Sequence, residues 1–380
     1  MNRMVLTQTA SLAPVSAEAD VEEGVPESAR LERAFNRPKG SAQRIPSLDG
    51  LRGISIWAVM LAHASTHFAG TLLHVRRVHV LLAIMAYFGV TTFFVISGFL
   101  ITKLLLREHM RTSRVNLGGF YRRRAVRILP AALSYILIVL LTAKVTAGQA
   151  ACALTFTTTY FFDYAAKPLQ QLWSLSVEEQ FYLLWPLAFC FGVRNAKRYC
   201  WVIIFLSPVI RIFLKHHGYT QYSHLAPAIG DSLTAGCLLA FYENQVAVFA
   251  KTYFRSTAAF LTLCLVTLSA GCLIYWRDAV LLWGIPPCLL ALLISVAIER
   301  QDRLLNSGLL VWTGLLSYSL YLWQQPFLVF DGPLNYFSVR ILMTFLMAYL
   351  SYRFIEQPVL NLYARRRSET HAAAPAVAAV

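Results

Sequence analysis

The sequence predicts an all-α integral membrane protein, a polytopic bundle of about ten transmembrane helices. Of its 380 residues, 57% are hydrophobic and only 14% are charged, and the mean hydropathy is +0.54. A typical soluble domain contains about 25% charged residues. Apolar runs approaching the roughly 20 residues needed to cross a bilayer recur along the chain. The main solvent of this protein is therefore expected to be lipid.

The two ends of the chain differ in composition from its middle. Residues 1–44 are polar and rich in Ala, Glu, Ser and Pro, and they lack the apolar core of a secretory signal peptide. We expect a disordered cytoplasmic tail there. Residues 361–380, with three consecutive arginines and an Ala-rich end, are expected to form a second disordered cytoplasmic tail. Residues 45–360 would then form one membrane domain.

Ten candidate spans lie between the tails, beginning near residues 53, 80, 128, 180, 200, 228, 256, 280, 309 and 338. Residues 150–162 are short and rich in threonine, so we expect an interfacial or re-entrant segment. Ten crossings place the main Lys and Arg clusters on the cytoplasmic side, as the positive-inside rule requires, with both termini inside. These clusters are residues 30–44, 103–127, 194–198, 251–255, 300–303 and 365–367. The exceptions are Arg76, Arg77, Lys144, Lys167, Arg211 and Lys215.

Charge and cysteine content narrow the functional classes. The net charge of +15 is spread between apolar runs, which favours anchoring to anionic lipid over nucleic-acid binding. Seven cysteines without a CxxC pair indicate small buried hydrophobes. Neither a disulfide framework nor a metal site is expected.

Arg52 and His63 are candidate functional residues of the first span. They are eleven residues apart, which on a helix is almost three turns and about 16 Å of rise along one face. Arg52 would lie at the cytoplasmic surface and His63 near the middle of the membrane. The alternative is an anchoring arginine and a hydrogen-bonded core histidine. Ionisable groups within spans usually face a cavity or a partner, which favours function for His63.

Arg124 and Arg127 form a second candidate group, because residues three apart share a helical face. Their guanidinium groups suit phosphate oxygens, so the pair could bind the phosphates of coenzyme A. The alternative is a topology signal. Glu178 and Glu179 are adjacent carboxylates, of which one could act on an acceptor hydroxyl or orient the histidine while the other caps the helix.

Aromatic and polar residues near these groups allow two interpretations. Trp173 and Tyr182 suit an interfacial belt or stacking against a sugar ring. Asp231 is either functional or a helix cap. The segment from Tyr318 to Pro326, which contains Tyr321 and Gln324, is either packing or part of an acceptor site.

Taken in order, these motifs resemble the membrane acyltransferase-3 family, which includes O-acetylases of O-antigen and exopolysaccharide. The resemblance is carried by Leu48–Gly53 with His63, Phe93–Thr102, Arg124 with Arg127, Trp173–Tyr182, Tyr318–Pro326 and Phe354–Pro358. It implies a ten-helix domain in the bacterial inner membrane that takes an acyl group, most often acetyl, from cytoplasmic acyl-CoA. Two departures stand out: Gln324 occupies a position where the family often has histidine, and the arginine often found shortly before Asp231 is absent.

The sequence therefore predicts an acyl-CoA-dependent O-acyltransferase that acts on a cell-surface or lipid-linked glycan, including lipopolysaccharide or exopolysaccharide. We expect His63 and Glu179 to be catalytic, and Arg52, Arg124 and Arg127 to bind the donor. The expected acceptor-binding residues are Glu178, Trp173, Tyr182, Asp231, Tyr321 and Gln324. Polysaccharide assembly proteins are possible partners. The alternatives are a transporter of a lipid-linked sugar or small anion, and a non-catalytic scaffold.

Overall fold

The computed structural model describes residues 45–65, 76–161, 167–219, 225–277, 284–329 and 336–372. The chain divides into Met1–Arg44 and Ile45–Val380, and the predicted tail over residues 1–44 lies outside the described residues. Within the described ranges the secondary structure is helical and contains no strand. The all-α prediction is confirmed.

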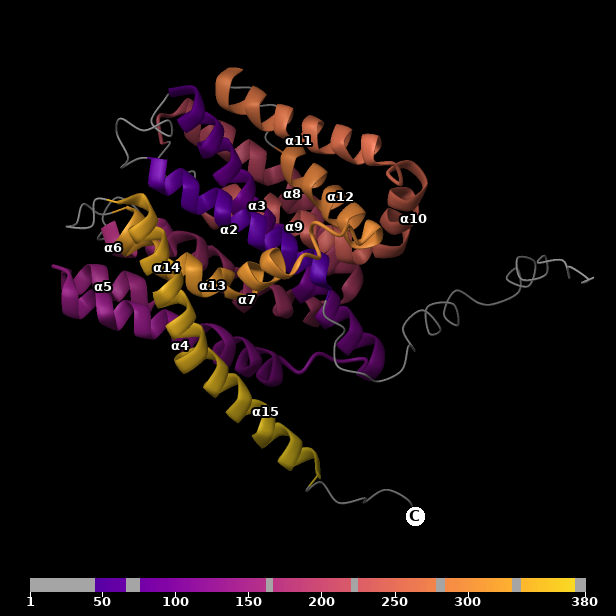
Figure 1. The fold of residues 1–380 in the computed structure, drawn as a ribbon. Helices are drawn as coiled ribbons and strands as arrows, with labels where there is room; N and C mark the ends of the chain where they lie inside the picture. The colour runs from indigo at the N-terminus through magenta and orange to yellow at the C-terminus, as the bar shows by residue number, and fades with distance from the viewer. Residues whose placement is uncertain are drawn as a thin grey trace, which may run out of the picture. The chain divides into compact units, whose positions relative to one another are not determined.

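Each predicted span corresponds to one helix in the described part of the chain (Figure 1). These helices are α2 (Pro46–Ser65), α3 (Arg76–Thr112), α4 (Leu117–Thr142), α7 (Leu172–Cys190), α8 (Val193–His216), α9 (Ala226–Phe241), α11 (Thr257–Arg277), α12 (Ile285–Arg300), α13 (Gly308–Leu328) and α14 (Phe337–Ser351). By length and composition, four described helices can cross a membrane, or five if the bent pair of α9 and the following helix counts as one span. The protein is thus a multi-pass membrane protein, and ten crossings remain a prediction.

Shorter elements connect the long helices. They are α5 (Ala147–Leu154), the 3₁₀ turn η2 (Thr158–Tyr160), α6 (Lys167–Gln170) and α10 (Glu243–Tyr253). With eight residues, α5 is about 12 Å long, so the described part of residues 150–162 is too short to cross. Helix α10 leaves α9 at an angle of 88°.

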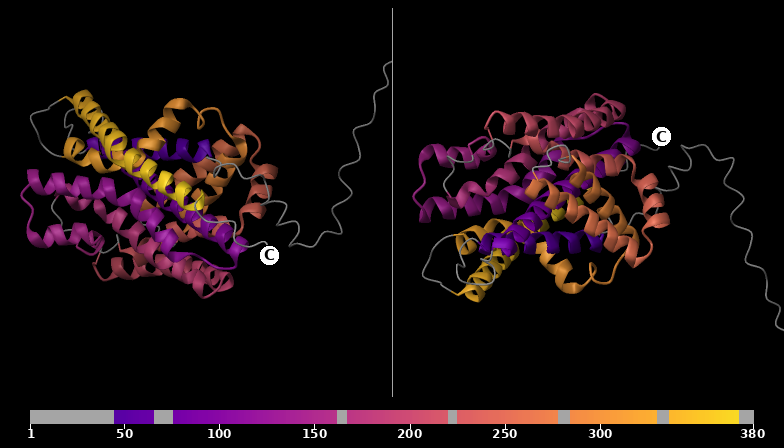
Figure 2. Two further views of the ribbon diagram at one scale, coloured as in Figure 1. Left: turned by 90° about the horizontal axis from the view of Figure 1, so that it is seen from below. Right: turned by 90° about the horizontal axis from the view of Figure 1, so that it is seen from above.

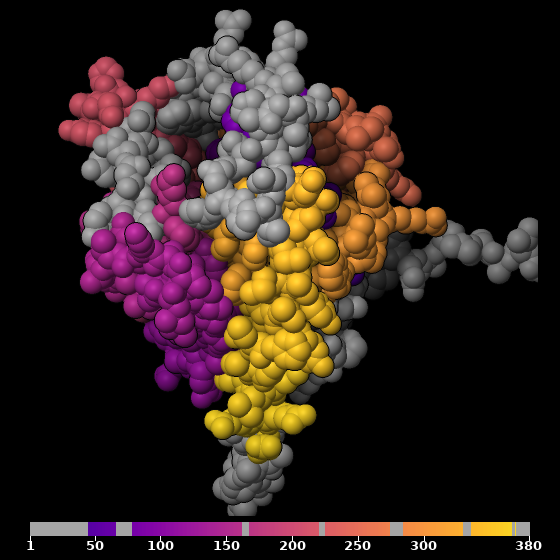
Figure 3. All heavy atoms as spheres, turned by 60° about the vertical axis from the view of Figure 1, so that its left-hand side comes forward, coloured from indigo at the N-terminus to yellow at the C-terminus, as the bar shows by residue number. Residues whose placement is uncertain are grey.

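The last helix continues beyond the predicted membrane domain. A π-helical turn, η5 (Tyr352–Glu356), joins α14 to α15 (Gln357–Ala372). The prediction of a disordered tail from residue 361 is therefore wrong as far as Ala372, because Ala, Arg and Glu in this segment are good helix formers. Figure 3 shows these yellow C-terminal helices beside the magenta helices α4 and α5, and α15 contacts α4.

Helix α2 lies among helices from the far end of the sequence (Figure 2). It runs parallel to α13, because Gly53 lies beside Thr313 and His63 interacts with Gln324. The backbones approach closely: a β-carbon at Gly314 would collide with the carbonyl oxygen of Asp49. Small residues permit such contacts between membrane helices. A parallel pair agrees with predicted spans one and nine running in the same direction.

Helices α3 and α7 are also parallel. The rings of Phe94 and Trp173 lie 6.2 Å apart, and the indole of Trp185 donates to the hydroxyl of Thr102 over 2.9 Å. In the predicted topology these helices are spans two and four, which cross in the same direction. Their packing therefore agrees with successive crossings of alternating direction.

Among the described residues, contacts gather the basic clusters 103–127, 251–255, 300–303 and 365–367 at one end of the bundle, called the basic end below. Lys103 pairs with Glu243, and Lys251 pairs with Glu299 over 3.0 Å. Arg300 donates to the backbone of Arg255. The guanidinium of Arg122 lies over the ring of Tyr363, which precedes the three C-terminal arginines. One exception to the predicted charge pattern, Arg211, instead pairs with Asp231 near the start of α9.

Candidate active site

A pocket of about 130 Å³ lies where α2, α3, α4, α7 and α13 meet, and it is called the arginine pocket below. Its polar lining includes Arg52, Arg124, Arg127, Ser97, Glu178, Tyr182, Tyr318 and Tyr321. Apolar residues such as Val59 and Phe93 supply the rest. The lining thus combines three guanidinium groups with one carboxylate in a mostly apolar setting.

Aromatic rings hold two of the three arginines. The guanidinium carbon of Arg124 lies 4.8 Å from the centroid of the Tyr182 ring, and that of Arg52 lies 6.0 Å from the Phe93 centroid. The carboxylate of Asp49, one turn earlier on α2, lies 3.9 Å from Arg52. Contact with an aromatic face orients a guanidinium without neutralising its charge. The pocket therefore retains positive charge for an anionic ligand.

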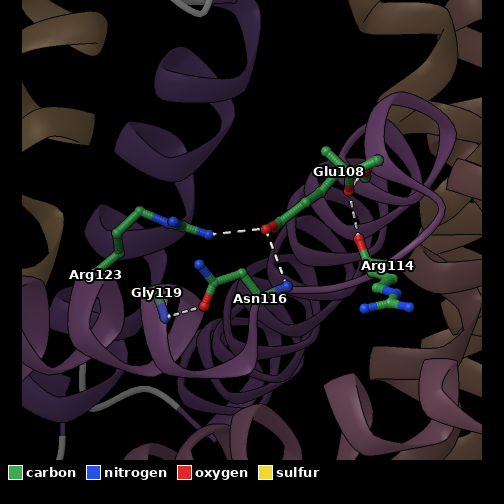
Figure 4. Close-up of polar contacts among 6 residues, drawn as sticks. Glu108, Arg114, Asn116, Gly119 and Arg123 are labelled. Atoms are coloured by element: carbon green, nitrogen blue, oxygen red, sulfur yellow. Dashed lines mark hydrogen bonds and ion pairs between the residues drawn. The ribbon is translucent and has the colours of Figure 1, made fainter. Parts of the chain in front are cut away.

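The connection between α3 and α4 fixes the helix that carries Arg124 and Arg127 (Figure 4). The carboxylate of Glu108 accepts hydrogen bonds from the backbone nitrogen of Asn116 over 3.1 Å and from Arg123 over 3.4 Å. The side-chain oxygen of Asn116 in turn caps α4 by accepting from the nitrogen of Gly119 over 2.8 Å. Such caps satisfy the unpaired donors of a helix N-terminus. Glu108 and Asn116 thus define where α4 begins.

Glu178 is held inside the arginine pocket by two hydroxyl groups. Ser97 on α3 donates to one carboxylate oxygen over 2.8 Å. Tyr182, one turn further along α7, donates to the other oxygen over 3.4 Å and to Ser97 over 3.1 Å. In this hydrogen bond the carboxylate has the position of a general base and the serine has the position of the hydroxyl that a base activates. The same carboxylate also balances part of the arginine charge.

His63 lies beyond the deep end of the arginine pocket. Arg52 and Val59 on α2 line the pocket, and His63 follows Val59 by one turn on the same face without lining the pocket itself. The imidazole interacts with Gln324 on α13, one turn after the pocket residue Tyr321. Gln324 is fully buried, and its amide reaches no full hydrogen-bond geometry with the described residues. Arg52, Val59 and His63 thus lie along one face of α2. The face of α13 that carries Tyr321 and Gln324 lies beside it.

Comparison with known proteins identifies the family. The family described as an acyltransferase domain matches residues 45–355, which includes every helix of the arginine pocket. The chain belongs to the acyltransferase-3 family. Its predicted resemblance is thereby confirmed.

Curated relatives of this acyltransferase-3 chain are O-acetyltransferases. The O-acetyltransferase OatA of Staphylococcus aureus strain NCTC 8325 is 29% identical over 374 residues, covering 87% of this chain and 58% of the relative. The peptidoglycan O-acetyltransferase OatA of Listeria monocytogenes is 27% identical, covering 84% and 56%. The putative peptidoglycan O-acetyltransferase YrhL of Bacillus subtilis is 27% identical, covering 83% and 55%. The chain thus spans less than two thirds of these relatives. No solved structure matches it.

The acyltransferase-3 chain brings together six of the eleven site residues predicted from sequence. Those that line the arginine pocket are Arg52, Arg124, Arg127, Glu178, Tyr182 and Tyr321. The remaining five, His63, Glu179, Trp173, Asp231 and Gln324, do not line it. Of these, His63 and Gln324 interact with each other, and Trp173 packs against Phe94.

The adjacent glutamates differ in position. Helix α7 begins at Leu172 and has no acidic residue in its first turn, so the interpretation of either glutamate as a helix cap is wrong. Glu178 faces the pocket, whereas Glu179 is outside the lining and lies within electrostatic range of Arg124. One Glu179 oxygen is buried and has no hydrogen-bond partner among the described residues. The structure therefore favours Glu178 as the carboxylate of the site.

Asp231 is part of a separate buried ion pair. It lies within α9, which has no acidic residue in its first turn, so the capping interpretation is wrong here too. Arg211 on α8 binds its carboxylate with both terminal nitrogens. Arg211 precedes Asp231 by 20 residues in the sequence and supplies the positive charge that balances its carboxylate. Sequence could not predict this pair, because the arginine lies on the preceding helix.

Two site residues received no role from sequence, although both lie in motifs that carry the family resemblance. Ser97 lies in Phe93–Thr102 and Glu356 in Phe354–Pro358. Glu356 belongs to the π-helical turn η5, where such turns often mark functional sites. It is 8% exposed, accepts a hydrogen bond from Ser319, and lies within electrostatic range of Arg127 and Arg52. Glu356 is thus a further carboxylate near the pocket arginines, in addition to Glu178, Glu179 and Asp49.

Proposed function

We propose that this protein is an O-acyltransferase that moves an acyl group, preferably acetyl, from cytoplasmic acyl-CoA to a hydroxyl of a cell-surface or lipid-linked glycan. The observation that carries the proposal is the arginine pocket, where Arg124 and Arg127 of α4 lie with Arg52 of α2, on the helix face that leads to His63. Membership of the acyltransferase-3 family supports the class of reaction.

The donor enters from the basic end. Arg52, Arg124 and Arg127 bind its phosphates, because guanidinium forks match phosphate oxygens and form charge-assisted hydrogen bonds. The basic end faces the cytoplasm by the positive-inside rule, where acyl-CoA is available. The acyl end of the donor then extends past Val59 towards His63.

His63 handles the proton or the acyl group. In a direct transfer it takes the proton of the acceptor hydroxyl, whose oxygen attacks the thioester carbonyl. The new carbon–oxygen bond forms, the carbon–sulfur bond breaks, and coenzyme A leaves as a thiolate that receives a proton from His63. In the two-step alternative the imidazole nitrogen carries the acyl group first and the hydroxyl then removes it. Gln324 orients the imidazole in both versions, since an amide hydrogen-bonds but does not titrate.

The acceptor is a glycan. Two of the relatives described above are named for peptidoglycan, which supports a glycan hydroxyl as the acceptor of this chain. Lipopolysaccharide and exopolysaccharide remain alternatives within the same proposal. Tyr182 and Tyr321 in the pocket, and Trp173 beside it, offer aromatic surface and hydroxyl groups to a sugar.

The decisive experiment uses the full chain in nanodiscs with labelled acetyl-CoA and a panel of glycan acceptors. The unmodified protein is expected to release free coenzyme A and label one acceptor. His63→Ala should lower the rate by about 10²- to 10⁴-fold, as expected for loss of a general acid–base group. Arg127→Gln should raise the KM for the donor at least about tenfold, through loss of a charge-assisted hydrogen bond.

Matched controls come from the same elements. Arg122 lies on α4 but outside the pocket, over the Tyr363 ring, so Arg122→Gln should leave the donor KM unchanged. His217 lies at the end of α8, and His217→Gln should retain full activity. Unaltered glycan acylation by folded His63→Ala protein would overturn the proposal. Labelled product from none of the acceptors, together with movement of a lipid-linked sugar, would instead favour a transporter.

A further inference from the structure

A second cavity, called the lateral groove below, lies between α8, α9, α10 and α12. It has a volume of about 550 Å³ and shares no lining residue with the arginine pocket. Trp201 and Phe249 in its lining are 42% and 45% exposed, so the groove opens on the outer surface of these helices. Its volume lies in the range of sites that hold small organic ligands, about 300–1,000 Å³.

The wall of the lateral groove is apolar along most of its length. Ile204 on α8, Leu239 on α9 and Leu292 on α12 represent the side chains that face it. The polar lining residues Tyr242 and Gln245 lie together at the bend between α9 and α10. A ligand that fills the groove is therefore apolar for most of its length and polar at this bend.

Lys197 lies at the polar end of the groove. Its ammonium nitrogen is 3.9 Å from the centroid of the Tyr242 ring. Lys197 precedes Trp201 by four residues and Ile204 by seven, so all three lie on one face of α8. A positive charge thus lies next to the polar end of an apolar channel.

No carboxylate in the described part of the chain forms an ion pair with Lys197. By contrast, Lys103 pairs with Glu243 and Lys251 pairs with Glu299 at the same basic end. Exposed Arg194 and Arg198 on α8 add further positive charge. The polar end of the lateral groove is therefore suited to an anion.

We propose that the lateral groove binds an anionic phospholipid of the surrounding bilayer. One acyl chain lies along the apolar wall, and the phosphate binds Lys197 and the amide of Gln245. Basic pockets between transmembrane helices on the cytoplasmic side are typical sites for anionic head groups. Helix α10 turns by 88° from α9 and forms the wall of the groove next to the head group. This site does not depend on the proposed acyl transfer.

Native mass spectrometry of the delipidated full chain in non-ionic detergent tests the proposal. Phosphatidylglycerol is expected to bind about fivefold more tightly than phosphatidylcholine with the same acyl chains, because one basic residue contributes about 1 kcal/mol to anionic lipid binding. Lys197→Gln should remove this preference and leave phosphatidylcholine binding unchanged. Ala291→Phe and Leu292→Trp, which fill the groove, should each lower the retention of both lipids.

The controls lie outside the groove. Lys144→Gln removes an exposed charge beyond the end of α4, and Leu183→Trp adds bulk on the exposed face of α7; both should bind phosphatidylglycerol as the unmodified protein does. Monodisperse elution and an unchanged circular dichroism spectrum show that each variant is folded. Equal binding of both lipids, or an unchanged preference in Lys197→Gln, overturns the proposal. Displacement of phosphatidylglycerol by a polyprenyl phosphate at lower concentration also overturns it.

Discussion

At the scale of single residues, the structure separates Glu178 from Glu179. Glu178→Gln is expected to lower acyl transfer at least tenfold, because it removes the negative charge that faces Arg52 and Arg124 and leaves only a neutral acceptor for the Ser97 hydroxyl. Glu179→Gln should change the rate less than threefold. Initial rates with labelled acetyl-CoA check both variants. A larger loss in Glu179→Gln would return the catalytic role to that residue.

Glu356 is expected to act as a positioning residue for the pocket arginines. Glu356→Gln keeps the hydrogen bond from Ser319 and removes the charge near Arg127. We expect a rise of about fivefold to tenfold in the KM for acetyl-CoA with little change in kcat, since the effect falls on donor binding. Glu299→Gln, which breaks the ion pair with Lys251 at the basic end, should leave both constants unchanged. A fall in kcat alone would contradict this role.

The residues of the site were only partly predictable from sequence. Arg52, Arg124 and Arg127 could be chosen because helical spacing and the family resemblance both favoured them. Glu178 could not be preferred over Glu179. The two side chains point about 100° apart on the helix, and each has both apolar and polar residues three or four positions away, so the sequence does not show which one faces the site. The choice depends on which face of α7 contacts α3, and that contact joins residues about 80 positions apart in the sequence.

At the scale of helices, glycine decides how closely α2 and α13 pack. Gly314→Leu should destabilise the protein by about 1–3 kcal/mol through overpacking against the Asp49 backbone, and it should lower activity by displacing Arg52. Gly308→Leu on the same helix meets open space and should alter neither property. Thermal unfolding in detergent and acyl-transfer rates measure the two effects. Equal melting temperatures for the two variants would contradict this packing argument.

Hydropathy predicted the helices well, but not their ends and bends. A run of apolar residues marks a helix wherever the bilayer is the solvent, so each predicted span matches a helix in the described residues. Helix α4 begins at Leu117 rather than near residue 128 because the basic, polar turn there is helical and capped by Asn116. The sharp turn into α10 and the π turn of η5 depend on tertiary packing, and neither has a local apolar signature.

At the scale of the whole molecule, the basic end is expected to face the cytoplasm. In a cysteine-free parent protein, Lys144→Cys should react with a membrane-impermeant maleimide in intact cells. Arg255→Cys, at the basic end, should react only after the membrane is permeabilised. Both side chains are exposed, so access to the reagent decides the outcome. Labelling of Arg255→Cys in intact cells would reverse the proposed orientation and place the donor pocket on the wrong side for acyl-CoA.

The π turn of η5 also sets the rotational phase of the C-terminal helix. Before it, Phe345 of α14 packs against Trp57 of α2 and Trp312 of α13. At its end, Glu356 contacts Ser319 of α13, and beyond it Tyr363 lies under Arg122 of α4. A π turn contains one residue more than the α-helical pattern needs, and deleting that residue would rotate everything downstream by about 100°. A shortened chain could keep Phe345 beside Trp312 or Glu356 beside Ser319, but not both. A single surplus residue thus allows one continuous helix to join two differently oriented neighbours.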